Sequence, residues 1–283
     1  MILIAESGST KCNWVLSNNK GKRIDVFNTI GFNPYFIDSE NIIIQLNKSD
    51  LSKYKSQIKS VFFYGAGCSS KDKNTIVKKS LTHFFNNAII QVKHDLDAAC
   101  FAMYNDMPNI TCILGTGSNS CYFDGKKIIE NAPSLGFIIG DEASGNYFGK
   151  KILQLYFNKL LNKELVKKFE KEYETDWPTI VNNIYNHNRA NVYLSKYFPF
   201  MIKNKTYPII NNIIFEALEK FFKLHVLCYN NHKDVDINFV GSVAYFLSDE
   251  IYKTATKYNC KIGGIIKNPI EKLTQFHLNQ INL

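Results

Sequence analysis

The stretch Ile-Thr-Cys-Ile-Leu-Gly-Thr-Gly-Ser-Asn-Ser, residues 110–120, determines how the rest of the chain is interpreted. Its first half, Ile110–Leu114, is an apolar run rich in β-branched residues, which is typical of a buried strand. The run stops at Gly115-Thr116-Gly117-Ser118, where two glycines let a ligand approach the backbone and where amides and hydroxyls can face an anion. Such a turn is more often an ordinary connection, so this stretch alone is a weak indication of a phosphate loop.

The beginning of the chain shows the same pattern. The apolar run Met1–Ala5 stops at Glu6-Ser7-Gly8-Ser9-Thr10-Lys11. Neither turn ends in the Gly-Lys-Ser/Thr sequence of a helix-opening Walker A loop. Two strand–turn–strand segments in one chain therefore predict a duplicated architecture with one phosphate loop in each half.

Length and composition indicate a globular protein with room for two domains. The 283 residues are 45% hydrophobic and 21% charged, and no apolar run approaches the roughly 18 residues of a membrane span. The formal charge of +9 comes from scattered lysines and not from a clustered stripe, so we expect no nucleic-acid and no membrane partner. The first residues lack a basic segment with a cleavage site, so we expect no signal peptide and a cytoplasmic protein.

Seven cysteines are distributed over the chain without a Cys-x-x-Cys pair. Several of them lie inside apolar runs, which favours reduced thiols buried in the core. Their spacing gives no indication of a metal or iron–sulfur site.

Short apolar runs alternate with turns and amphipathic segments along the chain, which predicts a mixed α/β fold. Strands are expected at residues 1–6, 13–17, 23–28, 60–64, 88–92, 110–114, 120–123, 127–130, 237–240 and 261–266. Helices are expected at residues 38–47, 69–86, 98–104, 143–160, 208–226, 245–258 and 269–277, with others between 164 and 233.

Two acidic residues, Asp95 and Asp97, lie between the expected strand 88–92 and the expected helix 98–104. One explanation is helix capping, because Asp is a favoured residue at a helix N-terminus. The other is a catalytic carboxylate at the end of a strand, just before the second phosphate loop. The two roles do not exclude one another.

Six blocks, in this order, resemble the BadF/BcrA-type ATPases and the N-acetylglucosamine kinase branch of the sugar-kinase, hsp70 and actin superfamily. They are Glu6–Lys11, Thr29–Pro34, Asp95–Ala99, Gly115–Asn119, Gly140–Gly145 and Gly241–Ala244, and the similarity spans essentially the whole chain. The resemblance implies two ribonuclease-H-like (actin-like ATPase) α/β domains with a cleft between them. These would comprise residues 1–113 and 114–267, the second holding most of the nucleotide, with a C-terminal helix in 268–283 that packs back on the first.

The resemblance also implies an ATP-dependent amino-sugar kinase with ATP and Mg²⁺ as cofactors. Its acceptor would be the 6-hydroxyl of N-acetylglucosamine or of a related N-acetylhexosamine such as N-acetylmuramic acid, and relatives are often homodimers. Asp95 matches the catalytic base, with Asp97 as the alternative, and Glu6 matches an acid near Mg²⁺, usually through water. Residues matching the nucleotide site are Gly8, Ser9, Thr10, Lys11, Gly115, Thr116, Gly117, Ser118, Gly241 and Ser242. Residues matching the sugar site are Asp95, Asn33, Asn119, Gly136 and Asp141.

Two positions depart from the family pattern. Glu6 stands where the family usually has Asp, and Ala143 stands where it usually has Gly, so that a Cβ would crowd a close backbone approach. Either change could lower activity, which keeps a non-catalytic regulator that binds sugar or nucleotide as one alternative. The other is an ATPase activator of a dehydratase or reductase. Such relatives carry an iron–sulfur cluster, and we disfavour this alternative because the block Thr29–Pro34 matches the family's sugar loop and because no plausible cluster cysteines stand out.

Overall fold

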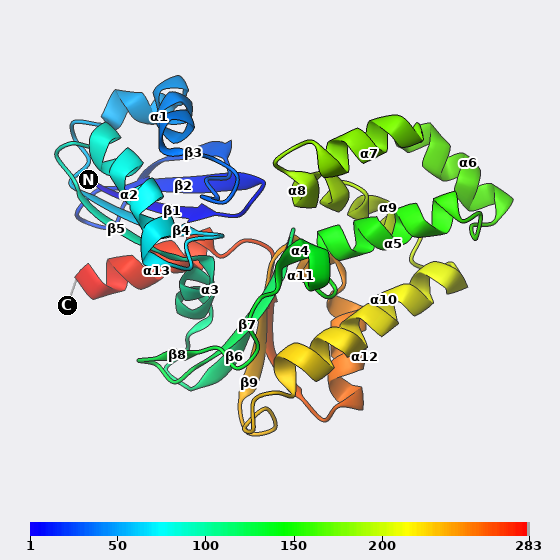
Figure 1. Cartoon of the computed structure of the whole chain (residues 1–283). Helices are drawn as coiled ribbons and strands as arrows, with labels where there is room; N and C mark the ends of the chain where they lie inside the picture. Colours follow the sequence, from blue (N-terminus) through cyan, green and yellow to red (C-terminus); the bar gives the residue numbers. More distant parts are fainter. Residues whose placement is uncertain (282–283) are drawn as a thin grey trace. The chain divides into compact units, whose positions relative to one another are not determined.

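The structure, a computed structural model, describes residues 1–281 and divides into two compact units (Figure 1). Unit 1 contains Met1–Asp106 and the C-terminal stretch that begins at Asn268, whereas unit 2 contains Met107–Lys267. The chain passes from unit 1 to unit 2 after Asp106, earlier than the expected domain boundary at residue 113. The reason is that strand β6 (Asn109–Leu114) pairs with strands of unit 2. None of the described helices is long and apolar enough to cross a membrane.

Unit 1 is built on a five-stranded sheet. Its strands are β1 (Ile2–Ser7), β2 (Lys11–Ser17), β3 (Arg23–Ile30), β4 (Ser60–Gly65) and β5 (Ile89–His94). The order is β3-β2-β1-β4-β5, with β1 to β3 antiparallel and with β4 and β5 parallel to β1. β1 is the central strand and is buried along most of its length, which explains its continuous apolar sequence.

Unit 2 repeats this topology. Its strands are β6, β7 (Ser118–Phe123), β8 (Ile128–Ile129), β9 (Asp236–Val240) and β10 (Lys261–Ile266). The order is β10-β9-β6-β7-β8, with β6 to β8 antiparallel and with β9 and β10 parallel to β6, so that β6 takes the place of β1. The predicted pair of ribonuclease-H-like α/β folds is confirmed.

The helices of unit 1 cover both faces of its sheet. They are α1 (Ser39–Lys48), the 3-10 helix η1 (Asp50–Tyr54), α2 (Lys71–Phe84), α3 (Asp95–Met103) and α13 (Ile270–Ile281). α1 and α2 pack on the face that carries Trp14 and Phe63, whose rings lie 5.8 Å apart. α13 contacts the opposite face, where the rings of Phe62 and His277 stack at 4.1 Å.

Unit 2 has a longer helical region between β8 and β9. The helices of this region are α4 (Gly136–Ile139), α5 (Gly145–Phe157), α6 (Lys163–Glu172), α7 (Trp177–Tyr185), α8 (Ala190–Ser195), α9 (Phe198–Lys203), α10 (Pro208–Phe221) and the π-helix η2 (Phe222–Val226). Two further helices, α11 (Ser242–Phe246) and α12 (Ser248–Lys257), lie between β9 and β10. α7 and α10 carry proline in their first turn, where no backbone N–H is needed. Phe221 and Phe222, where α10 meets η2, are fully buried in the core of unit 2.

Three helices differ from the sequence expectation. The expected helix 245–258 is two helices, α11 and α12, which meet at Leu247. The expected helix 208–226 changes its hydrogen bonding in the last turn, where the N–H of Leu227 donates to the Phe222 carbonyl, five residues back, at 2.9 Å. The four-residue helix α4 was not expected, because it is too short to show a periodicity.

Candidate active site

In unit 1, two loops and helix α3 begin at the carboxyl-terminal ends of the parallel strands β1, β4 and β5. Ser7, the last residue of β1, is aligned with Gly65 at the end of β4, and Gly65 is aligned with His94 at the end of β5. Ligands of α/β sheets bind beyond this edge. The strand register therefore brings the loop after β1, called phosphate loop one (residues 8–10), to the same edge as Asp95, which follows His94.

Phosphate loop one packs closely against residues 29–34, although the two segments are separate in the sequence. The N–H of Gly31 donates to the Thr10 carbonyl at 3.1 Å, and a Cβ on Gly31 would lie only 2.0 Å from the Gly8 carbonyl oxygen. Asn33 donates from Nδ2 to Ser9 Oγ at 3.0 Å. Glycine is therefore required at position 31 by the close approach of the two backbones.

Asn33, expected at the sugar site, is 6% exposed and lies between two loops. Its Oδ1 accepts a hydrogen bond from the N–H of Tyr35 at 3.0 Å. A Cβ on Gly67 would lie 2.2 Å from the same oxygen, and Gly67 has a left-handed φ of 78°. The turn after β4 thus packs directly on Asn33, which fixes this side chain beside phosphate loop one.

Glu6 lies at the end of β1 opposite Asn13 on β2, and Asn13 Nδ2 donates to Glu6 Oε2 at 3.0 Å. Desolvation raises the pKa of Glu6 to about 7; the Asn13 hydrogen bond opposes this rise and the negative charge of Asp95 adds to it. A divalent cation would relieve the repulsion between these two carboxylates, so the donors fit Mg²⁺. No group of three metal-ligating side chains occurs among residues 1–281, so water and phosphate oxygens would supply the other ligands.

Asp95 and Asp97 both lie in the first turn of α3 but have different partners. Asp97 accepts a hydrogen bond from the His94 N–H at 3.2 Å and lies 3.8 Å from Lys93 Nζ. Asp95 Oδ1 lies 3.2 Å from His94 Nε2. Burial raises the pKa of Asp97. The capping role therefore belongs to Asp97, and the carboxylate of Asp95 is placed at the strand edge without it.

In unit 2, the loop Gly115–Ser118, called phosphate loop two, is held by the segment 140–146. Asp141 Oδ1 accepts from the N–H of Ser118 at 3.1 Å, and Asp141 Oδ2 accepts from Asn146 Nδ2 at 2.6 Å. Asn146 also donates to the Thr116 carbonyl through its backbone N–H at 3.1 Å and through Nδ2 at 2.6 Å. Asn146 was missed in the sequence, although its place directly after the Gly140–Gly145 block was a signal that could have indicated it.

The turn that carries Asp141 has an unusual backbone. Asp141 and Ala143 both have left-handed φ angles, of 57° and 56°. This conformation costs an L-residue roughly 1–2 kcal/mol and costs glycine almost nothing. Ala143 is fully buried. The handedness of the backbone is therefore a second reason why glycine suits this position, beside the expected crowding.

Gly241 and Ser242, expected to contact adenosine, lie beside phosphate loop two. β6 and β9 are parallel neighbours, and Gly241 follows the end of β9. A Cβ on Gly241 would lie 2.2 Å from the Leu114 carbonyl oxygen, and its φ of 126° also demands glycine. Ser242 then begins α11. The two predicted nucleotide turns of unit 2 are therefore adjacent at the carboxyl-terminal edge of its sheet.

The other two expected sugar residues of unit 2 have different surroundings, because Asn119 is buried and Gly136 is only partly buried. Asn119 on β7 accepts from the Ser120 N–H at 2.8 Å and donates to Glu130 at 3.4 Å. Gly136 begins α4 with a φ of 72°, and a Cβ there would meet no atom within 4 Å. Glycine at this position is thus explained by its φ and not by a close contact.

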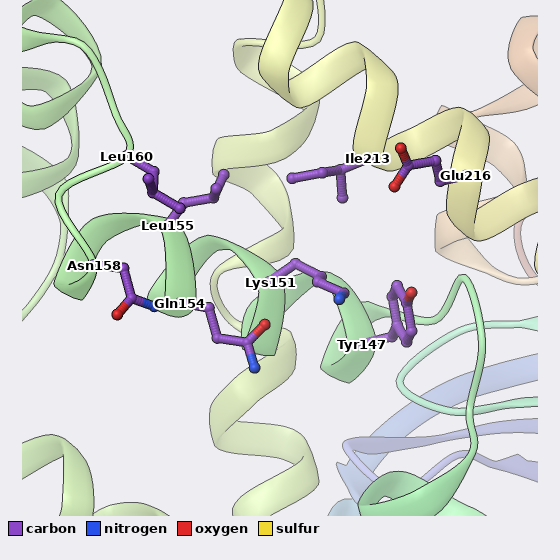
Figure 2. Close-up of a pocket in the computed structure, with 8 residues that line it drawn as sticks. All are labelled: Tyr147, Lys151, Gln154, Leu155, Asn158, Leu160, Ile213 and Glu216. Atoms are coloured by element: carbon purple, nitrogen blue, oxygen red, sulfur yellow. The ribbon is translucent and has the colours of Figure 1, made fainter.

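A pocket of about 300 Å³ lies between α5 and α10 (Figure 2). α5 supplies Tyr147, Lys151, Gln154 and Leu155, α10 supplies Ile213 and Glu216, and Asn158 and Leu160 complete the lining. None of them was a predicted site residue. The pocket was not foreseen, because packing between two helices leaves no local sequence signal.

Two units of one repeated topology, each with a Gly/Ser/Thr loop at the carboxyl-terminal edge of its sheet, define an actin-like ATPase fold. The chain is 32% identical to the "Putative N-acetylglucosamine Kinase" from Porphyromonas gingivalis, over 99% of both chains and with a TM-score of 0.91. The chain belongs to the family of this protein, among the ATP-dependent sugar kinases of the actin-like ATPase superfamily.

Two more distant structures share the fold. One is the "Putative N-acetylglucosamine Kinase" from Chromobacterium violaceum, with 13% identity over 97% of this chain and 98% of that one and a TM-score of 0.65. The other is a ROK family glucokinase from Streptomyces griseus in complex with glucose and AMPPNP, with 11% identity over 96% and 98% and a TM-score of 0.57. Neither a protein-family model nor a curated protein matches the sequence.

Proposed function

We propose that the protein transfers the γ-phosphate of ATP to the 6-hydroxyl of N-acetylglucosamine or of a related N-acetylhexosamine such as N-acetylmuramic acid. One observation carries the proposal: a single strand edge of unit 1 aligns phosphate loop one, the Asn33 loop and the carboxylate of Asp95. A sugar kinase needs these three parts together, because it must bind phosphate, orient a hydroxyl and remove its proton. The six ordered sequence blocks support a place in the BadF/BcrA-type branch.

In the proposed reaction, Asp95 accepts the proton of the sugar hydroxyl while the hydroxyl oxygen attacks the γ-phosphorus and ADP leaves. Asn33, Asn119, Gly136 and Asp141 would provide hydrogen bonds to the sugar. Asp141 and Asn33 already have protein partners at 3.1 and 3.0 Å, so we expect them to bind sugar only while sharing these hydrogen bonds.

The phosphates would bind to backbone amides and hydroxyls of phosphate loop one, of Lys11 and of phosphate loop two. The adenosine would bind to Gly241 and Ser242. Amide-lined turns at strand ends are suited to anions. Mg²⁺ would be held near Glu6 through water, and when bound it neutralises charge on the transferring phosphate. Lys11 is exposed, so its amine can reach a phosphate or remain in solvent.

A coupled ADP-release assay tests the proposal. Wild-type protein is given ATP and Mg²⁺ with N-acetylglucosamine, N-acetylmuramic acid, N-acetylmannosamine, glucosamine, glucose or no sugar. We expect release that depends on one N-acetylated sugar. Release without any sugar would contradict the proposal and favour the activator-type ATPase, whereas folded protein that binds ATP and releases no ADP would favour a non-catalytic regulator.

A further inference from the structure

Glu142 is a buried carboxylate beside the residue that holds phosphate loop two. Its side chain is 7% exposed, and its two oxygens have separate partners: Oε1 lies 3.2 Å from Lys220 Nζ and Oε2 lies 3.3 Å from His225 Nε2. Although desolvation opposes it, hydrogen bonds from the backbone, Lys220 and His225 hold the pKa of Glu142 below its ordinary value. Glu142 is therefore a buried anion held by two side chains.

The π-helix η2 explains how two residues five apart reach one carboxylate. In a regular α-helix, residues 220 and 225 would point roughly 140° apart, since each residue turns the helix by about 100°. A π-turn closes its hydrogen bonds over five residues and brings such positions toward one side. Lys220 lies at the end of α10 and His225 in η2, and both contact Glu142. Short π-segments within α-helices occur frequently at functional sites.

The contacts of Glu142 continue directly to phosphate loop two. Glu142 is flanked by Asp141 and Ala143, the two residues with left-handed backbone, so its side chain anchors the middle of this strained turn. On one side of the turn, Asp141 binds the Ser118 N–H and Asn146. α10 and η2 thus hold Glu142, and its neighbour in the chain, Asp141, binds phosphate loop two.

Stability alone does not explain this arrangement. Replacing a buried ion pair with apolar residues is often neutral or stabilising, because removing charges from water is costly. In addition, His225 Nδ1 is buried and has no hydrogen-bond partner in the described part of the chain, which is a further cost. His225 is only 6% exposed, and its ring stacks on Phe221 at 5.0 Å, so its orientation is constrained.

We propose that His225 and Lys220 are positioning residues for nucleotide binding: through Glu142 they hold the Asp141 turn, and through that turn the backbone of phosphate loop two. They act through other residues and do not touch the nucleotide. The inference rests on the proposed function insofar as phosphate loop two binds ATP.

The experiment uses the full chain with single substitutions. Lys220→Met and His225→Phe remove the two contacts with Glu142, and His225→Gln keeps a hydrogen-bond donor of similar reach. Lys205→Met is the matched control, because Lys205 Nζ lies 2.9 Å from Glu250, a second glutamate of unit 2 whose side chain is also 7% exposed. Glu250 lies on α12 and not on the turn that supports the loop.

We expect Lys220→Met and His225→Phe to raise KM for ATP about tenfold each, with KM for the sugar unchanged and with His225→Gln close to wild type. Lys205→Met should lower Tm while leaving KM for ATP unchanged. The inference would be overturned if KM for ATP stayed within about twofold of wild type in both Lys220→Met and His225→Phe. It would also be overturned if Lys205→Met raised KM for ATP as much as they do.

Direct calorimetry with AMPPNP separates this inference from the proposed function. If wild type binds AMPPNP but phosphorylates no sugar, the proposed function fails while the Kd values of the same variants still test the positioning role. The inference then predicts weaker AMPPNP binding in Lys220→Met and His225→Phe only, and equal Kd values in all variants would overturn it.

Discussion

The carboxylate of Asp141 accepts a hydrogen bond at 3.1 Å from the backbone N–H of Ser118, 23 residues earlier in the chain. This bond joins the sequence block that resembles a sugar-binding element to the loop that resembles a phosphate-binding one. The carboxylate of Asp141 is therefore a candidate both for binding the sugar and for supporting phosphate loop two. Substitutions of Asp141 can distinguish between these two roles.

Asp141→Asn keeps an oxygen acceptor for the Ser118 N–H and suits a left-handed backbone, but it loses the acceptor for Asn146 Nδ2. Asp141→Ala removes both acceptors. We expect Asp141→Ala to raise KM for ATP at least about tenfold and to lower Tm, because a buried N–H loses its partner. Asp141→Asn should raise KM for ATP less than Asp141→Ala does, because the Ser118 N–H keeps its acceptor. A rise in KM for the sugar alone in Asp141→Asn would assign the charge to the sugar site and contradict a purely supporting role.

The two aspartates of α3 should respond differently to removal of their charge. Asp95→Asn is expected to lower kcat about 10²–10⁴-fold while nucleotide still binds, as is usual when a general base is lost. Asp97→Ala is expected to lower stability by about 1 kcal/mol through loss of its cap on the His94 N–H. Steady-state kinetics and thermal unfolding of both variants check this, and full activity in Asp95→Asn would exclude Asp95 as the base.

Glu6 should make the metal-free protein less stable as the pH rises. Its folded-state pKa of about 7 lies above the ordinary 4.5, so the folded chain binds more protons than the unfolded chain between these values. Stability relative to Glu6→Gln is thus highest below pH 4.5 and declines up to about pH 7. Urea unfolding of both proteins in EDTA measures this difference, and a constant difference across the range would contradict the raised pKa.

His277 should make the protein less stable as the pH falls, which is the opposite of the effect of Glu6. It accepts or donates a hydrogen bond with the Tyr64 hydroxyl at 2.8 Å, and burial lowers its pKa from 6.5 to about 4. As the pH falls from 6.5 to 4, His277 becomes protonated in the unfolded chain but stays neutral in the folded one. The free energy of unfolding therefore falls by up to about 3 kcal/mol over this range. His277→Phe keeps a ring against Phe62 and should lack this loss, which urea unfolding at pH 4.5 and 7 can compare.

Local sequence was sufficient to predict most strands, the principal helices and the duplicated fold. The runs before Glu6 and Gly115 stop abruptly at glycine-rich turns, and each became the central strand of a sheet. Apolar periodicity and turn residues act over a few positions, so their consequences are visible without tertiary contacts. The roles assigned to the individual site residues remain predictions.

Tertiary structure alone decided which of these residues support one another. Three contacts depend on strand register and on loops that return to the same edge of a sheet. They join Gly31 to Gly8, Asn33 to Ser9 and Asp141 to Ser118. The π-turn that aligns Lys220 with His225 is likewise invisible in the sequence, since it is set by packing and not by local preference. Sequence therefore determined the elements and the candidate chemistry, whereas long-range packing determined which backbone each side chain holds, because those contacts form only when distant segments meet.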